Sequence, residues 1–385
     1  MQQKNNIRVM QTISLLQGMV FYASVATLYR QTAGLSVFQI ALIESLSLAL
    51  SLLLEIPWGV LADRIGYRKT MICCCFLFFL SKIIFWQAQG FGGFLAERLL
   101  LAVTLSGLSS VDESILYASC REEEVQKVFG RTQALGTAGL VFASIVCALF
   151  VGDHYRLAGL FTMIAYGLAA LCSLFLVETK PAQRVRQSPL AGFRESLELV
   201  FHSRRLFSLI LCGALFGEVT HTITVFLNQL QYTRCGWSST LISAAYILAT
   251  LSEMSSTCSA PLTQRLGERR TGMMLLCASA VSCTLLSFTS NGWISLLCLL
   301  GMSLAAALFT PLSSTMENRL ITINDRATAL SVSSLLQDSI ALLLNLLLGR
   351  AADHSLPLAM ALGGGLCLLS MVMFSCSSSK SKTSC

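Results

Sequence analysis

Ionisable side chains lie inside long apolar stretches of this sequence, and they are the residues whose chemistry stands out. A charged group within a membrane-spanning helix is costly, so it is a candidate for a functional role. Acids and histidine in such places can take up and release protons, and bases can pair with the acids. Eight residues form this set: Glu44, Lys82, Glu97, Arg98, Glu218, His221, Glu253 and Asp338.

Apolar runs long enough to cross a bilayer recur along the whole chain and must position these residues. The chain is 54% hydrophobic and only 12% charged, whereas soluble domains carry about 25% charged residues. No small-residue cleavage site follows the first run, so we expect a helix there rather than a removed signal. We predict an all-α membrane protein with twelve transmembrane helices near 8–30, 37–60, 70–89, 93–117, 131–151, 156–177, 205–227, 238–260, 271–289, 292–315, 327–348 and 356–375.

The basic residues indicate the orientation of the chain. With the N-terminus in the cytoplasm, 21 of the 27 Lys and Arg fall on cytoplasmic segments, as the positive-inside rule requires. The exceptions are Arg30, Arg156, Arg234 and Arg350 on outer loops and Lys82 and Arg98 within helices. We therefore expect a multi-pass protein of the inner (cytoplasmic) membrane with both termini in the cytoplasm. The net charge of +7 then reflects topology, and we expect no nucleic-acid partner.

A short charged loop follows the second apolar run. The segment reads Gly59-Val-Leu-Ala-Asp-Arg-Ile-Gly-Tyr-Arg-Lys69. It places the acid Asp63 beside Arg64 and Arg68, with the helix-breaking Gly66 between the two bases. A basic loop of this kind at a helix end can anchor topology or can act as a gate.

This loop resembles the Gly-x-x-x-Asp-Arg-x-Gly-x-Arg-Lys motif that the major facilitator superfamily carries between its second and third helices. The preceding Glu55-Ile-Pro-Trp-Gly59 resembles a pattern common among prokaryotic members. The resemblance implies two six-helix bundles related by pseudo-two-fold symmetry. We expect these bundles at 1–177 and 205–376, a cytoplasmic linker at 178–204 that includes an amphipathic helix or serves as a plain tether, and a tail at 377–385.

The second half of the chain repeats elements of the first. Tyr29…Gly34-Leu-Ser36 is echoed by Tyr232…Gly236-Trp-Ser238, and the charged loop is echoed by Ala260-Pro-Leu-Thr-Gln-Arg-Leu-Gly-Glu-Arg-Arg270. The second loop has Gln264 in the place of Asp63. A charged latch is therefore expected in the first copy only.

The resemblance also implies gating roles. In the family, the acid at the position of Asp63 latches against the start of helix 11, which here begins near Arg326, and a helix start favours an anion. We expect Asp112 and Glu113 to approach the bases of the charged loop, and Glu317 to form gating ion pairs with Arg319 and Arg326. The predicted gating set is Asp63, Arg64, Gly59, Gly66, Arg68, Asp112, Glu113, Glu317 and Arg326.

The family fold implies a pathway lined by helices 1, 4, 7 and 10. On that assignment Arg98, Glu97, Glu218 and His221 face the pathway, Gln17 and Tyr22 supply neutral hydrogen bonds, Asp338 lies at the seam, and Glu44 is the expected partner of Arg98. Lys82 is expected to pair with Glu97 or Glu44 in a structural role. Leu95-Ala-Glu-Arg98 resembles a worn helix-4 motif of proton-driven members, although Glu97 can equally serve only to neutralise Arg98.

These observations favour a secondary active transporter. The sequence has no phosphate-binding loop, no catalytic constellation and no metal-ligand pattern, so we expect no enzyme activity, no cofactor and no metal site. We expect a monomer in the lipid bilayer that moves a small-molecule substrate with protons, and we favour export of a drug-like or metabolic compound. Uptake of a nutrient is the alternative, and a non-transporting receptor or scaffold is a further one.

Overall fold

The computed structural model describes residues 2–109, 111–120, 125–152, 154–178, 200–321 and 326–377, and its described secondary structure is helical. Contacts divide the chain into two compact units. Unit 1 comprises Met1–Val185 and Ser238–Ile247, and unit 2 comprises Arg186–Trp237 and Leu248–Cys385. Most of the predicted linker lies outside the described residues, and so does the end of the tail.

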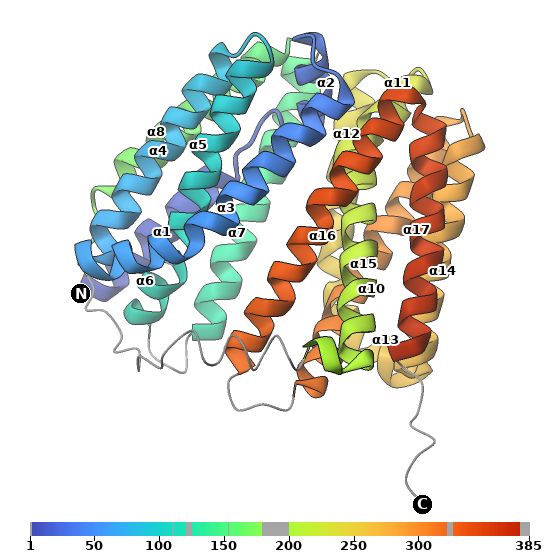
Figure 1. Ribbon diagram of the computed structural model, residues 1–385. Helices are drawn as coiled ribbons and strands as arrows, with labels where there is room; N and C mark the ends of the chain where they lie inside the picture. Colours follow the sequence, from blue (N-terminus) through green and yellow to red (C-terminus); the bar gives the residue numbers. More distant parts are fainter. Residues whose placement is uncertain are drawn as a thin grey trace, which may run out of the picture. The chain divides into compact units, whose positions relative to one another are not determined.

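The helices of unit 1 within Met1–Val185 are coloured blue to green in Figure 1. Successive long helices of this unit are joined by short connections, and non-consecutive helices also pack side by side. The elements are α1 (Gln2–Gly18), the 3₁₀ turn Ala23–Val25, α2 (Ala26–Thr32), α3 (Val37–Ile65), α4 (Tyr67–Gln87), α5 (Phe91–Ser109), α6 (Asp112–Ser119), α7 (Val125–Val146), the π-turn Cys147–Val151 and α8 (Tyr155–Ser173).

Unit 2 runs from green to red in Figure 1. The first part of its second long helical stretch, Ser238–Ile247, is assigned to unit 1 by its contacts. The elements are α10 (Arg204–His221), the π-turn Thr222–Leu227, α11 (Asn228–Arg234), α12 (Ser239–Glu253), the 3₁₀ turn Met254–Cys258, α13 (Ser259–Leu266), α14 (Glu268–Phe288), α15 (Gly292–Leu320), α16 (Arg326–His354) and α17 (Leu356–Ser377).

Eleven helical stretches among the described residues are long and apolar enough to span a membrane. The eighth predicted helix, near 238–260, is not among these eleven because it is interrupted: α12 has 15 residues and continues through the 3₁₀ turn into α13. Helix 7 is also longer than predicted, because a π-turn joins α10 to α11 within a 31-residue stretch.

The two charged loops share one backbone geometry. Gly66 has a φ of 93° and Gly267 has a φ of 83°, and each separates two helices. L-residues with side chains rarely adopt such angles, so glycine is the residue that the turn requires. The repeat seen in the sequence is therefore present in the backbone.

The first predicted helix is broken. α1 ends at Gly18, and the chain resumes a helical path only at the turn Ala23–Val25. Two side chains of α8 bind backbone groups near the break: the backbone N–H of Phe21 donates to Thr162 Oγ1 at 3.0 Å, and the Tyr166 hydroxyl donates to the Gln17 carbonyl at 2.6 Å. Irregular backbone at membrane depth is tolerated only where such partners exist.

Close packing of α1 against α7 depends on glycine. A Cβ atom at Gly18 would collide with the carbonyl oxygen of Gly136, and one at Gly139 would collide with the carbonyl oxygen of Leu15. Small residues allow helix backbones to approach in a membrane, where no hydrophobic force drives helices together. The break after Gly18 therefore lies beside a tight helix–helix contact.

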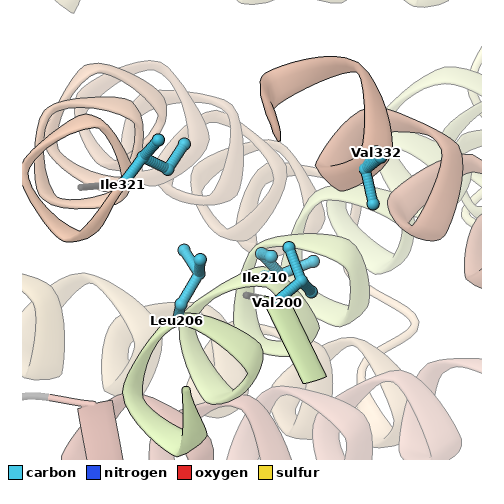
Figure 2. Packing of buried hydrophobic residues seen from close by; sticks show 5 residues of the cluster. All are labelled: Val200, Leu206, Ile210, Ile321 and Val332. Carbon is cyan, nitrogen blue, oxygen red and sulfur yellow. The ribbon is translucent and has the colours of Figure 1, made fainter. Parts of the chain in front are cut away.

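The end of the linker region packs into unit 2. Val200 is buried with Leu206 and Ile210 of α10, and this cluster also contains Ile321 and Val332 of the α15–α16 region (Figure 2). Apolar contact of this kind fixes the point where the chain enters unit 2.

Candidate functional site

Glu44 of α3 lies between two arginines in unit 1. Its Oε1 accepts a hydrogen bond from Arg30 Nη1 at 2.8 Å, and its Oε2 accepts hydrogen bonds from Arg98 Nε at 2.7 Å and from Arg98 Nη2. Arg30 and Glu44 are buried, whereas the Arg98 side chain is 28% exposed. The predicted pairing of Arg98 with Glu44 is confirmed.

Arg30, expected on the outer side at the end of the first predicted helix, was not predicted to pair with Glu44. It lies at the end of α2, and the turn to α3 returns the chain so that its guanidinium reaches Glu44. A lone charge this deeply buried would be expensive, and the carboxylate supplies the compensating charge. Arg30 and Glu44 stand on the two sides of one short turn, so their spacing in the sequence is compatible with this ion pair.

Lys82 of α4 forms a second buried pair. Its Nζ donates to Glu97 Oε1 at 3.1 Å and to the Tyr22 hydroxyl at 2.9 Å. It also lies 5.2 Å from the ring centroid of Phe78 and 5.6 Å from that of Tyr166, within cation–π range. Glu97 and Glu44 were both predicted as partners of Lys82, and the structure shows the pair with Glu97. Tyr22 belongs to the same cluster.

Gln17 borders a small cavity in unit 1. Its Nε2 lies 3.7 Å from Cys75 Sγ, and the cavity has a volume of about 170 Å³. Asp112, predicted as a gating residue, lines the same cavity together with Ser14 and Gln133. The structure thus brings Gln17 and Asp112 together at one polar space.

Arg68 of the charged loop binds the end of α8. Its Nε donates to the carbonyl of Leu176 at 2.5 Å and its Nη2 to that of Leu174 at 3.4 Å. The backbone N–H of Arg68 donates to Glu178 Oε1 at 3.3 Å. Cationic groups stabilise the carbonyls at a helix C-terminus, so this base anchors the exit from α8.

Asn6 of α1 holds the same segment from the other side. Its amide exchanges two hydrogen bonds with the backbone of Val177, each 2.9 Å long. Neither Asn6 nor Glu178 was predicted from the sequence, because neither belongs to a motif.

Two other predicted gating residues belong to the first charged loop. Arg64 is exposed at the end of α3, and Gly66 forms the turn described above. The side chains of Asp63, Glu113 and Arg326 lie outside the part of the chain that the structure describes, and Gly59 lies within α3.

Glu317 does not pair with Arg319, contrary to the prediction. Arg319 binds Glu268 of α14 at the surface, while Glu317 is buried at 7% exposure. Residues two apart on a helix point in widely different directions, so one faces the surface when the other faces inward. Glu317 instead lines a cavity of unit 2.

This cavity has a volume of about 490 Å³ and lies between α10, α12, α15 and α16. His221, predicted for the pathway, lines it from α10, and Glu253 lines it from the end of α12. Hydroxyl-bearing residues and phenylalanines complete much of the wall, and they include Thr220, Thr224, Ser256, Thr310, Ser313, Ser314, Phe216 and Phe309.

Glu218 lies one turn before the π-turn of helix 7. The Thr222 hydroxyl is 2.9 Å from Glu218 Oε1 and 3.3 Å from Asn345 Oδ1 of α16, so it donates to one of them at a time. π-turns inside helices are often found at functional sites. Asp338 is half-buried on α16, next in sequence to the cavity residue Gln337.

Comparisons with known proteins agree with this architecture. The family model described as Major Facilitator Superfamily matches residues 9–343. A probable 4-methylmuconolactone transporter of Cupriavidus pinatubonensis (strain JMP 134 / LMG 1197) is 24% identical over 265 residues, which are 65% of this chain and 60% of that protein.

Among solved structures, the nucleoside transporter NupG matches with a TM-score of 0.82 at 15% identity, over 98% of this chain and 100% of that chain. A bacterial homolog of the human lysosomal transporter Spinster, in an inward-facing and unoccupied conformation, matches with a TM-score of 0.73 at 17% identity, over 97% and 95% of the two chains. Likeness at these identities shows the fold alone.

Proposed function

Because the chain belongs to the major facilitator superfamily, we propose that it is a secondary active transporter that moves a small organic solute across the cytoplasmic membrane by alternating access, coupled to protons. The multi-pass helical architecture and the transporter relatives support the transport function. The proposed fold has twelve membrane helices, with α12 and α13 together supplying the eighth.

The observation that carries proton coupling is the environment of the carboxylates in unit 2. Glu218 accepts a hydrogen bond from a neutral hydroxyl, and Glu317 and Glu253 border a cavity. A carboxylate at the wall of a cavity can take up and release a proton there, whereas one held by arginine or lysine already has its compensating charge. Glu218, with His221 three residues on, is the proposed proton carrier.

The pairs in unit 1 are proposed to be structural. Glu44 is shared by two guanidinium groups and Glu97 by an ammonium group. Removing one partner of such a pair leaves an uncompensated buried charge. Arg98, being the most exposed of these bases, is the one best placed to meet a solute as well.

We favour export of an amphipathic compound. The cavity wall combines Phe216, Phe309, Ala306 and Ala307 with many hydroxyls, which suits a permissive site. Uptake of a nutrient remains the alternative, and the direction is set by which side loads the proton.

Orientation and gating belong to the same proposal. The distribution of Lys and Arg supports cytoplasmic termini in the inner membrane, and a monomer is the expected form. Asp63 is proposed to latch the start of α16 when the cytoplasmic side closes, with Arg68 holding the loop against the end of α8.

Transport by the purified protein in liposomes tests the proposal. The compound panel would contain 4-methylmuconolactone, a nucleoside and a lipophilic cation, each measured with and without an imposed pH gradient. We expect at least one compound to accumulate only when the gradient is present. Accumulation that is equal with and without the gradient would refute proton coupling, and no movement of any panel compound in either direction would count against this solute class.

A further inference from the structure

The cavity of unit 2 has an uneven balance of charge. Its lining contains two acids, Glu253 and Glu317, and one histidine, His221. Among the described residues that line it, none is Lys or Arg. With the histidine neutral, the wall therefore offers negative charge and no fixed positive charge to an occupant.

Glu317 is the acid whose position is hardest to explain without an occupant. It is 7% exposed, and no base among the described residues forms an ion pair with it: Arg319 binds Glu268, and the side chain of Arg326, its other predicted partner, lies outside the described residues. The Ser333 hydroxyl of α16 lies near Glu317 but makes no hydrogen bond of ordinary geometry. An ionised carboxylate buried without compensation is costly, so it must carry a proton or have a cation beside it.

The groups around Glu317 suit a cation that also carries apolar surface. Phe216 and Phe309 line the cavity with their rings 4.9 Å apart in an edge-to-face arrangement. Aromatic faces attract cations, and their attraction grows when water is excluded. Glu253 adds a second carboxylate, from α12, and Thr310 and Ser313 add hydroxyls from α15.

We propose that this cavity binds an organic cation, such as a lipophilic ammonium or phosphonium compound, with Glu317 as its counter-ion and Phe216 and Phe309 as its apolar and cation–π contacts. The proposal rests on the transport function proposed above and specifies the substrate class for this cavity. Neutral and anionic compounds of the same shape bind less tightly, because they leave the buried carboxylate uncompensated.

Binding to the purified full-length protein tests the charge preference without requiring transport. The probes are tetraphenylphosphonium, its anionic counterpart tetraphenylborate and the neutral triphenylphosphine oxide, measured by isothermal titration calorimetry in detergent. We expect the cation to bind most tightly. Glu317→Gln keeps the shape but removes the charge, and should weaken cation binding by about tenfold or more.

Two variants keep the result interpretable. Glu317→Asp keeps the charge and should retain more cation binding than Glu317→Gln, whereas Glu268→Gln, on the surface pair with Arg319, should bind like wild type. Equal or tighter binding of tetraphenylborate, or unchanged cation binding in a folded Glu317→Gln protein, would overturn the proposal. If cation binding fails while the pH gradient still drives accumulation of another compound, the transport function stands and only this assignment is wrong.

Discussion

In unit 1 the buried carboxylates of Glu44 and Glu97 are bound by basic side chains. In unit 2 the carboxylate of Glu218 is hydrogen-bonded by a hydroxyl, and that of Glu317 borders a cavity. The two units repeat the same turns, yet they differ in how their acids are neutralised. The comparison shows described ion pairs at the buried acids of unit 1, whereas in unit 2 Glu253 and Glu317 border a cavity.

The largest loss of stability is expected for Lys82→Ala. This change leaves Glu97, which is 1% exposed, without its base, and breaking one partner of a buried pair costs about 3–5 kcal/mol. Thermal unfolding in detergent should show a much lower melting temperature. The double variant Lys82→Met/Glu97→Met should recover most of the loss, since an apolar pair of similar volume is often neutral. A wild-type melting temperature in Lys82→Ala would show that the pair does not hold unit 1 together.

The triad of unit 1 predicts an order among its variants. Glu44→Ala leaves two bases without their acid, so it should destabilise more than Arg98→Ala, which leaves Glu44 bound to Arg30. Because Arg30 shares the carboxylate, Arg98→Ala/Glu44→Ala should not return to wild-type stability. Melting temperatures of the three proteins check this order, and full recovery in the double variant would mean that Arg30 contributes nothing.

A smaller effect is expected at the end of α8. Arg68→Ala removes charged hydrogen bonds to the carbonyls of Leu174 and Leu176. Each such bond contributes about 1.5–3 kcal/mol at most, and water molecules that bind the exposed carbonyls offset part of the loss. Arg64→Ala is the matched control, because Arg64 is exposed in the same loop. Urea-induced unfolding should separate the two variants, and equal midpoints would contradict an anchoring role for Arg68.

The smallest effect is expected for the surface pair of unit 2. Arg319 is 65% exposed and Glu268 is 38% exposed, and pairs of this kind contribute about 0–1 kcal/mol. Arg319→Ala should therefore leave the melting temperature nearly unchanged at ordinary salt. A loss as large as that of Lys82→Ala would remove the distinction between the two kinds of ion pair.

Much of the architecture could be predicted from the sequence, because it depends on local signals. Apolar length identified most membrane helices, and Gly66 and Gly267 marked the turns where a positive φ is needed. The break after Gly18 was not predicted, since it is stabilised by Thr162 and Tyr166 of a distant helix.

Partners of charged side chains were predicted only in part. The similar depths of Arg98 and Glu44 along their helices were enough to predict that these two side chains pair. The partners of the other charged side chains depend on how each helix is rotated about its own axis. Arg30 was placed on the outer side without a partner, and Glu317 was assigned to Arg319 and Arg326, of which Arg319 binds Glu268 instead. The cavity that Glu317 lines is formed by four helices and has no sequence signature.

The central claim is that proton coupling resides in the carboxylates of unit 2. Its most direct test is accumulation of a transported compound by liposomes that contain Glu218→Gln, under an imposed pH gradient, with exchange at equal concentrations measured in parallel. The account predicts that exchange persists while accumulation against the gradient is lost. Full pH-driven accumulation by Glu218→Gln would contradict it.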